Sequence, residues 1–247
     1  MKRRRDAEIS SEIRSAIQEL SAASERDVVK PTAERDSVKP AAEREGVKPA
    51  AERCGDDLQT TLQIPIKPFL SLCNLLIQVL DKIGPTMAVL RQDIHQNIQR
   101  LETVHDSDPL RYWDVVEILK KEVSEGKAKK GPTCSKAFVW LTRSLDFSVT
   151  SLKLLVEDFE RDMEQAVEES YNNTLKPWHG WISSAAYKVA LKLVPDTKSL
   201  IDILKAKDAD NGMLKKEMRI LISLLVPQLE RNYETMRTYG LDKLKSM

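Results

Sequence analysis

The sequence predicts an all-α protein of about eight helices that follow an irregular N-terminal region. Glycine is sparse, with 8 residues in a chain of 247, which favours helices over sheets. From Phe69 onward, apolar residues recur at spacings of three and four, as they do on the buried face of a helix. No segment alternates convincingly between apolar and polar residues, as a half-buried strand would.

Residues 1–60 are expected to form a disordered, mixed-charge tail. A nine-residue repeat, VKPxAERxx, occurs three times between Val29 and Gly55. Each repeat offers little for a core, and each proline removes a backbone donor, so a packed structure is not expected. Residues 6–20 are weakly amphipathic and compatible with one short helix. We expect removal of residues 1–57 to leave stability nearly unchanged.

Eight amphipathic segments follow and define a domain over residues 62–247. Gly84 and Pro85 end the first helix, Asp108 and Pro109 are expected to begin the third, and Pro227 is expected to kink the last. The predicted helices span residues 69–83, 86–104, 109–125, 135–157, 161–175, 178–193, 197–206 and 212–238.

Composition and motifs exclude several classes of function. The net charge of +1 gives no strong bias toward nucleic acid. The three cysteines show neither a CxxC pair nor a metal-binding spacing, which fits reduced thiols in a cytosolic protein. The apolar runs are too short to span a bilayer, and no nucleophile, nucleotide or His–Glu motif is present. We therefore expect a cytoplasmic, non-enzymatic protein with no catalytic residue, metal or cofactor.

Three polar residues share one face of the second predicted helix. Asp93, Asn97 and Arg100 are spaced i, i+4 and i+7 and flank the apolar stripe that includes Ile94. Such a stripe is usually only a solvated face. Its chemistry nevertheless suits a ligand with hydroxyl and amide groups, because Asp accepts hydrogen bonds, Asn donates and accepts, and Arg donates.

Two aromatic motifs come later in the chain. Trp140 opens the run Trp140-Leu141-Thr142-Arg143, and its flat indole would suit the apolar face of a sugar ring. His179 lies in Trp178-His179-Gly180-Trp181. From the residues alone, a Trp or a His in such a setting is more often a structural residue than a functional one. The spacing of His95 and His105 offers no metal site with His179.

The order and spacing of these motifs resemble the glycolipid transfer protein family over residues 62–245. The resemblance implies a two-layer helical sandwich that encloses an apolar lipid cavity. It implies that Asp93, Asn97 and Arg100 bind the sugar–amide region of a glycosphingolipid. Trp140 would stack on the first sugar, and His179 would hydrogen-bond the ceramide amide. Trp181 matches a Trp of the family that contacts membranes.

The residues at these positions also indicate a branch of the family. Phosphosphingolipid members have Lys in place of Asn97 and Arg in place of Trp140, so this chain resembles the glycolipid-selective branch. Arg100 replaces the Lys of animal glycolipid members. The run Leu145-Asp146-Phe147 after the Trp140 motif looks closer to plant members, where glucosylceramide and inositol-phosphate sphingolipids dominate.

The function implied is non-enzymatic transfer of glycosphingolipids, such as glucosylceramide, between membranes. Exposing a sixteen-carbon chain to water costs roughly 12 kcal/mol, so a carrier must enclose the hydrocarbon. Residues expected to line or back the cavity are Phe69, Leu72, Leu76, Leu90, Ile98, Phe138, Leu145 and Leu152. We expect a monomer that contacts membranes transiently; no protein partner is predicted. A sphingolipid sensor, a carrier of ceramide or other sphingolipids, and a helical interaction module without a ligand remain alternatives.

Overall fold

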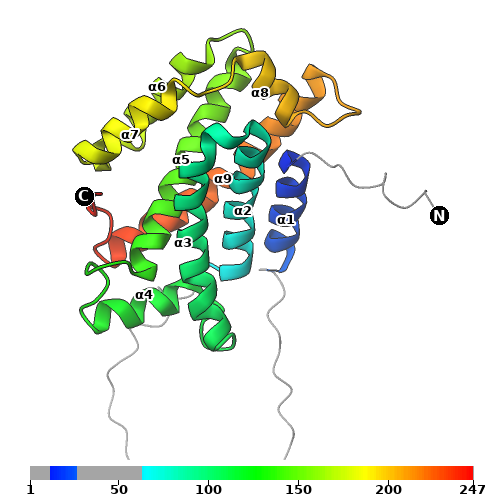
Figure 1. Cartoon of the computed structure of the whole chain (residues 1–247). Helices are drawn as coiled ribbons and strands as arrows, with labels where there is room; N and C mark the ends of the chain where they lie inside the picture. Colours follow the sequence, from blue (N-terminus) through cyan, green and yellow to red (C-terminus); the bar gives the residue numbers. More distant parts are fainter. Residues whose placement is uncertain (1–11, 27–62, 247) are drawn as a thin grey trace, which may run out of the picture.

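The computed structural model describes residues 12–26 and 63–246, and these are almost entirely helical (Figure 1). The all-α prediction is confirmed for the described residues, where the one β-bridge joins Pro65 to Asp114. The helices are α1 (Glu12–Arg26), α2 (Ile66–Ile83), α3 (Ala88–Ser107), α4 (Val115–Ser124), α5 (Cys134–Glu157), α6 (Met163–Asn173), α7 (Trp181–Leu191), α8 (Thr197–Leu204) and α9 (Asn211–Thr238), with 3-10 turns η2 (Pro85–Met87) and η3 (Lys176–Trp178).

The core lies between two layers of helices. Helices α1, α2 and α3 lie side by side in front of α5 and α9 (Figure 1). The rings of Phe69 on α2 and Phe138 on α5 meet at 5.3 Å between centroids. Ile98 on α3, Leu141 on α5 and Leu214 on α9 are fully buried. The apolar stripes read from the sequence thus meet in one core, with the exception of Leu90, which is 40% exposed at the start of α3.

Helix α1 is part of this core, which corrects the expected N-terminal tail. Ile13, Ala16 and Leu20 are buried, and the helix packs against α2 and α9. Arg14 adds ion pairs of 2.8 Å to Asp208 and 2.6 Å to Glu217. The prediction of disorder is therefore wrong for residues 12–26, because the weak amphipathic pattern finds an apolar surface to cover. The repeats at 28–55 lie outside the described residues.

Helix α4 begins six residues later than expected. The N-cap is Asp114, whose Oδ1 accepts from Val116 N at 2.9 Å and from Ile64 N at 3.0 Å. Asp108 instead accepts from Arg111 N at 3.1 Å within a turn. The prediction of a helix start at Asp108 and Pro109 is wrong because Asp114 satisfies two buried donors at once, and one of them comes from the distant segment before α2.

Helices α6 and α7 form an arm at the side of the bundle (Figure 1). Helix α7 packs against α6 and buries only Leu191, whereas Trp181 is 80% exposed. The helix predicted from residue 178 begins instead at Trp181, so His179 and Gly180 lie in the connection between η3 and α7. Among the described residues, no helix is long and apolar enough to cross a membrane.

The packing of α1 predicts that single substitutions there lower stability. Ile13→Ala and Leu20→Ala should each cost about 2–4 kcal/mol, because each leaves a cavity beneath α1. For a chain of this size, that corresponds to a melting temperature lower by roughly 5–15 °C, measurable by circular dichroism. Gln18→Ala, on the exposed face of the same helix, is the control. Equal melting temperatures for all three variants would show that α1 does not stabilise the core.

Candidate functional site

The polar face of α3 contains a preformed hydrogen-bonded pair beside a carboxylate. Asn97 is buried, and its Nδ2 donates to Asp93 O at 3.0 Å. Its Oδ1 accepts from Arg100 Nη1 at 3.0 Å. The Asp93 side chain is exposed, and no hydrogen bond to its carboxylate occurs among the described residues. The face thus presents one fixed amide–guanidinium pair and one acceptor that is free to bind a ligand.

Capping interactions fix where α5 starts relative to this face. Glu122 of α4 accepts from Cys134 N at 2.9 Å and from Ser135 N at 2.7 Å, so it satisfies the first free donors of α5. Cys134 Sγ lies 3.4 Å from Arg100 O. Because α5 runs opposite to α3 (Figure 1), Trp140, six residues further on, lies level with the turn of α3 that carries Asp93.

His179 lies beside aromatic rings from two helices. Its ring centroid is 5.6 Å from that of Trp140 on α5 and 5.5 Å from that of Tyr171 on α6. Its Nδ1 lies 3.3 Å from Tyr171 Oη, which in turn lies 3.3 Å from Ser184 Oγ on α7. This contact orients the imidazole and leaves Nε2 as the ring nitrogen without a hydrogen-bond partner among the described residues.

Burial changes the acid–base properties of two site residues. Desolvation raises the pKa of Asp93, and the charge of Arg100 partly opposes this rise. Desolvation also lowers the pKa of His179, and the positive charge of Arg143 adds to the effect. His179 is therefore neutral near pH 7 and can donate or accept a single hydrogen bond without burying a charge.

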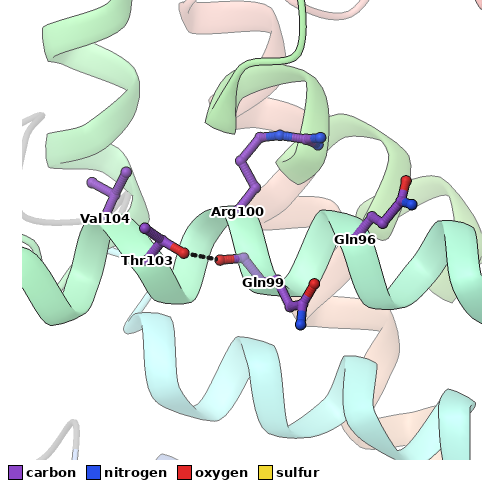
Figure 2. Close-up of a pocket in the computed structure, with 5 residues that line it drawn as sticks. All are labelled: Gln96, Gln99, Arg100, Thr103 and Val104. Carbon is purple, nitrogen blue, oxygen red and sulfur yellow. Dashed lines mark hydrogen bonds between the residues drawn. The ribbon is translucent and has the colours of Figure 1, made fainter.

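Arg100 also borders a shallow hollow of about 380 Å³ on the outer face of α3 (Figure 2). The hollow is lined by Gln96, Gln99, Arg100, Thr103 and Val104. Thr103 Oγ1 donates to Gln99 O at 2.7 Å, the contact drawn as a dashed line in Figure 2. Four of the five lining residues carry an amide, hydroxyl or guanidinium group.

The structure places the sequence-predicted residues in two groups and adds others. Asp93, Asn97 and Arg100 lie together on α3, and Trp140 contacts His179. Trp181, two residues after His179, is largely exposed at the start of α7. Sequence reasoning missed the roles of Tyr171 and Arg143. Arg143 follows Trp140 by three positions and so shares its helix face, a signal that the motif already contained.

The lowered pKa of His179 predicts a specific loss of stability in acid. The unfolded chain binds a proton at this residue near pH 6.5, whereas the folded chain resists it, so acidification from about pH 7 to about pH 5 favours the unfolded state. His179→Gln removes this contribution. We expect its melting temperature to fall less than that of the wild type over the same range, as measured by calorimetry. Identical falls in both proteins would contradict the assigned burial of His179.

Comparison with known proteins confirms the family resemblance. Residues 64–206 match the family described as glycolipid transfer protein. Glycolipid transfer protein 3 of Arabidopsis thaliana is 56% identical over 185 residues, which cover 75% of this chain and 79% of that protein. Glycolipid transfer protein 2 of Arabidopsis thaliana is 51% identical over 191 residues, covering 77% and 86%.

Solved structures share the fold. The GLTP-fold structure that describes how FAPP2 selects simple glycosphingolipids is 26% identical, with a TM-score of 0.68 over 75% of this chain and 90% of that one. A point mutant of Arabidopsis ACD11 in complex with C12 ceramide-1-phosphate has a TM-score of 0.71 over 95% and 98% of the two chains, at 14% identity. From the family match and the identity with the Arabidopsis proteins, this chain belongs to the glycolipid transfer protein family.

Proposed function

We propose that this protein transfers single glycosphingolipid molecules between membranes, with Asp93, Asn97, Arg100, Trp140 and His179 binding the headgroup. The observation that carries the proposal is the Asp93 carboxylate, which lacks a hydrogen-bond partner among the described residues and adjoins the fixed Asn97–Arg100 pair. Desolvation raises the pKa of this exposed carboxylate, and hydrogen-bond donors from a ligand favour its charged form. Two neighbouring sugar hydroxyls can supply such donors.

The aromatic half of the site complements this polar half. Trp140 is half-buried on α5, with its ring near His179. An indole in this position can cover the apolar face of the first sugar. His179, held neutral and oriented through Tyr171, can hydrogen-bond the ceramide amide. The Arabidopsis relatives are named glycolipid transfer proteins, which favours a glycolipid as the cargo.

The proposed lipid transfer needs no catalytic group. Transfer makes and breaks no covalent bond, so the protein lowers the barrier to lipid desorption by offering an apolar environment for both hydrocarbon chains. The headgroup contacts then decide which lipid is carried, since hydrocarbon burial alone discriminates poorly between sphingolipids.

Docking on the membrane is assigned to the exposed face of α7. Trp181 is 80% exposed and is followed by Ile182 at 52%. Val189 extends the apolar face two turns further along the helix, at 66% exposure. A tryptophan with its ring in an apolar layer and its N–H in water suits the membrane interface. Because the patch is small, docking is reversible, as a carrier requires.

Replacing Asp93 tests whether its carboxylate binds the lipid headgroup. Asp93→Val should abolish transfer of fluorescent glucosylceramide between vesicles and leave helix content intact, because the side chain is exposed and has no structural partner in the described residues. Asp106→Val, an equally exposed aspartate near the end of α3, is the matched control and should transfer normally. Unchanged transfer by Asp93→Val would refute the assignment. Transfer of ceramide phosphate in preference to glucosylceramide would keep the carrier and overturn the headgroup.

Membrane docking can be tested separately with two exposed tryptophans. Trp181→Ala should weaken binding to phosphatidylcholine vesicles about tenfold, because it removes the largest apolar side chain of the docking face. Trp113→Ala is the control, since Trp113 is 44% exposed in the loop before α4, away from α7. Binding by vesicle flotation, without cargo, separates docking from lipid recognition. An equal effect of both substitutions would show that α7 is not the docking face.

A further inference from the structure

Arg143 is fully buried, which is unusual for an arginine. Its guanidinium lies between two indoles, with Cζ 5.0 Å from the ring centroid of Trp140 and 4.1 Å from that of Trp178. Nη1 donates to Leu244 O at 2.7 Å, and Nη2 donates to Asp242 O at 2.8 Å. A buried cation needs such partners, because burying it without them would be strongly unfavourable. The side chain therefore ties α5 to the end of the chain.

The same chain end also binds the start of α7. Ser246 N donates to Trp178 O at 2.9 Å, and Gly180 N donates to Ser246 Oγ at 2.9 Å. The hydroxyls of Ser183 and Ser246 are 2.9 Å apart. These contacts lie on both sides of His179 in the sequence. Residues 241–246 thus connect the element that carries Trp140 with the segment that carries His179.

We propose that Arg143 and residues 241–246 act as a C-terminal strap that holds Trp140 and His179 in one arrangement and thereby sets the affinity for the headgroup. Arg143 is a positioning residue in this scheme, since it is buried behind the two rings and acts through them. The claim that the strap sets the affinity for the headgroup rests on the proposed function. The claims that the strap exists and that it acts on His179 do not rest on it.

The strap holds in place a segment that few other contacts restrain. His179 precedes α7, which packs against α6 and buries only Leu191. An arm attached so lightly does not by itself keep His179 at a constant distance from Trp140 on α5. A site whose groups are already oriented binds more tightly, because less conformational entropy is lost on binding. The strap supplies this orientation through contacts that the ligand does not need to touch.

The charge of Arg143 affects the pKa of His179, and this effect of the strap can be measured without lipid. Burial is the main cause of the low pKa of His179, and the nearby positive charge of Arg143 contributes to it. Among the described residues, the imidazole itself contacts Trp140 and Tyr171, and Arg143 is the charged group that acts on its pKa. Removing the arginine, or the contacts that hold it in place, should therefore raise the pKa of His179.

The experiment uses the full chain with three changes. Arg143→Met removes the charge and both hydrogen-bond donors. Arg143→Lys keeps the charge but cannot donate to two carbonyls in a fork. Truncation after Leu241 removes both carbonyl acceptors. Arg219→Met, on the exposed face of α9, is the control. For each protein, NMR titration gives the pKa of His179 without lipid, and vesicle transfer of glucosylceramide gives activity.

We expect Arg143→Met to raise the pKa of His179 and to slow transfer about tenfold or more, since it removes two charge-assisted hydrogen bonds. Arg143→Lys should leave the pKa low but still slow transfer, which separates position from charge. Truncation combined with Arg143→Met should be no worse than the slower single variant, because both changes break the same contact. If Arg143→Met does not fold, the lysine variant and the truncated chain carry the same test.

Three results would overturn the strap: an unchanged pKa of His179 in Arg143→Met, normal transfer by the truncated chain, or additive effects of the two changes. If the wild-type protein moves no glucosylceramide, the proposed cargo fails. The His179 titration then still decides whether the strap exists, because it requires no lipid.

Discussion

Much of this site depends on one constraint, the need of a buried guanidinium for polar partners. The carbonyls that satisfy Arg143 come from residues 242 and 244, so the chain must turn back after α9. Gly240 makes the turn, with a φ of 62° in the left-handed region. Gly240 N bonds Arg237 O, and Leu241 N bonds Met236 O at 2.7 Å, the two contacts of a Schellman motif. The end of α9 thus delivers residues 241–246 to the site.

The sequence predicted those parts of the fold that local pattern determines. Stripes such as Phe69 on α2 and Phe138 on α5 identify helices, because a helix buries one face wherever its partner comes from. The errors occur where a distant segment decides. The N-cap is Asp114 rather than Asp108 because Ile64, fifty residues earlier, needs an acceptor. Helix α1 is ordered because α2 and α9 offer an apolar surface, which its own weak amphipathicity could not reveal.

The same distinction applies to the site. Asp93, Asn97 and Arg100 could be grouped from the sequence, because residues at i, i+4 and i+7 of one helix are neighbours whatever the tertiary structure. The family resemblance was needed to add Trp140 and His179, which come from other elements. Arg143 could not be assigned a role, because its partners lie about a hundred positions away and are backbone carbonyls, which every residue carries. The side chains of residues 242 and 244 take no part in these hydrogen bonds, so their identity does not reveal them.

The hydrogen bonds within the site indicate which residue discriminates between lipids. Asn97 already has two protein partners, Asp93 O and Arg100, so a ligand that bonds to it must exchange existing contacts for new ones. Exchange yields a small net free energy. The exposed Asp93 carboxylate has no such partner among the described residues, and desolvation raises its pKa. In the proposed function, a headgroup with two hydroxyl donors gives this carboxylate partners without displacing protein contacts, whereas bare ceramide offers fewer donors. In the proposed function, selectivity for a sugar therefore arises chiefly at Asp93, while Asn97 and Arg100 form the fixed polar surface beside it.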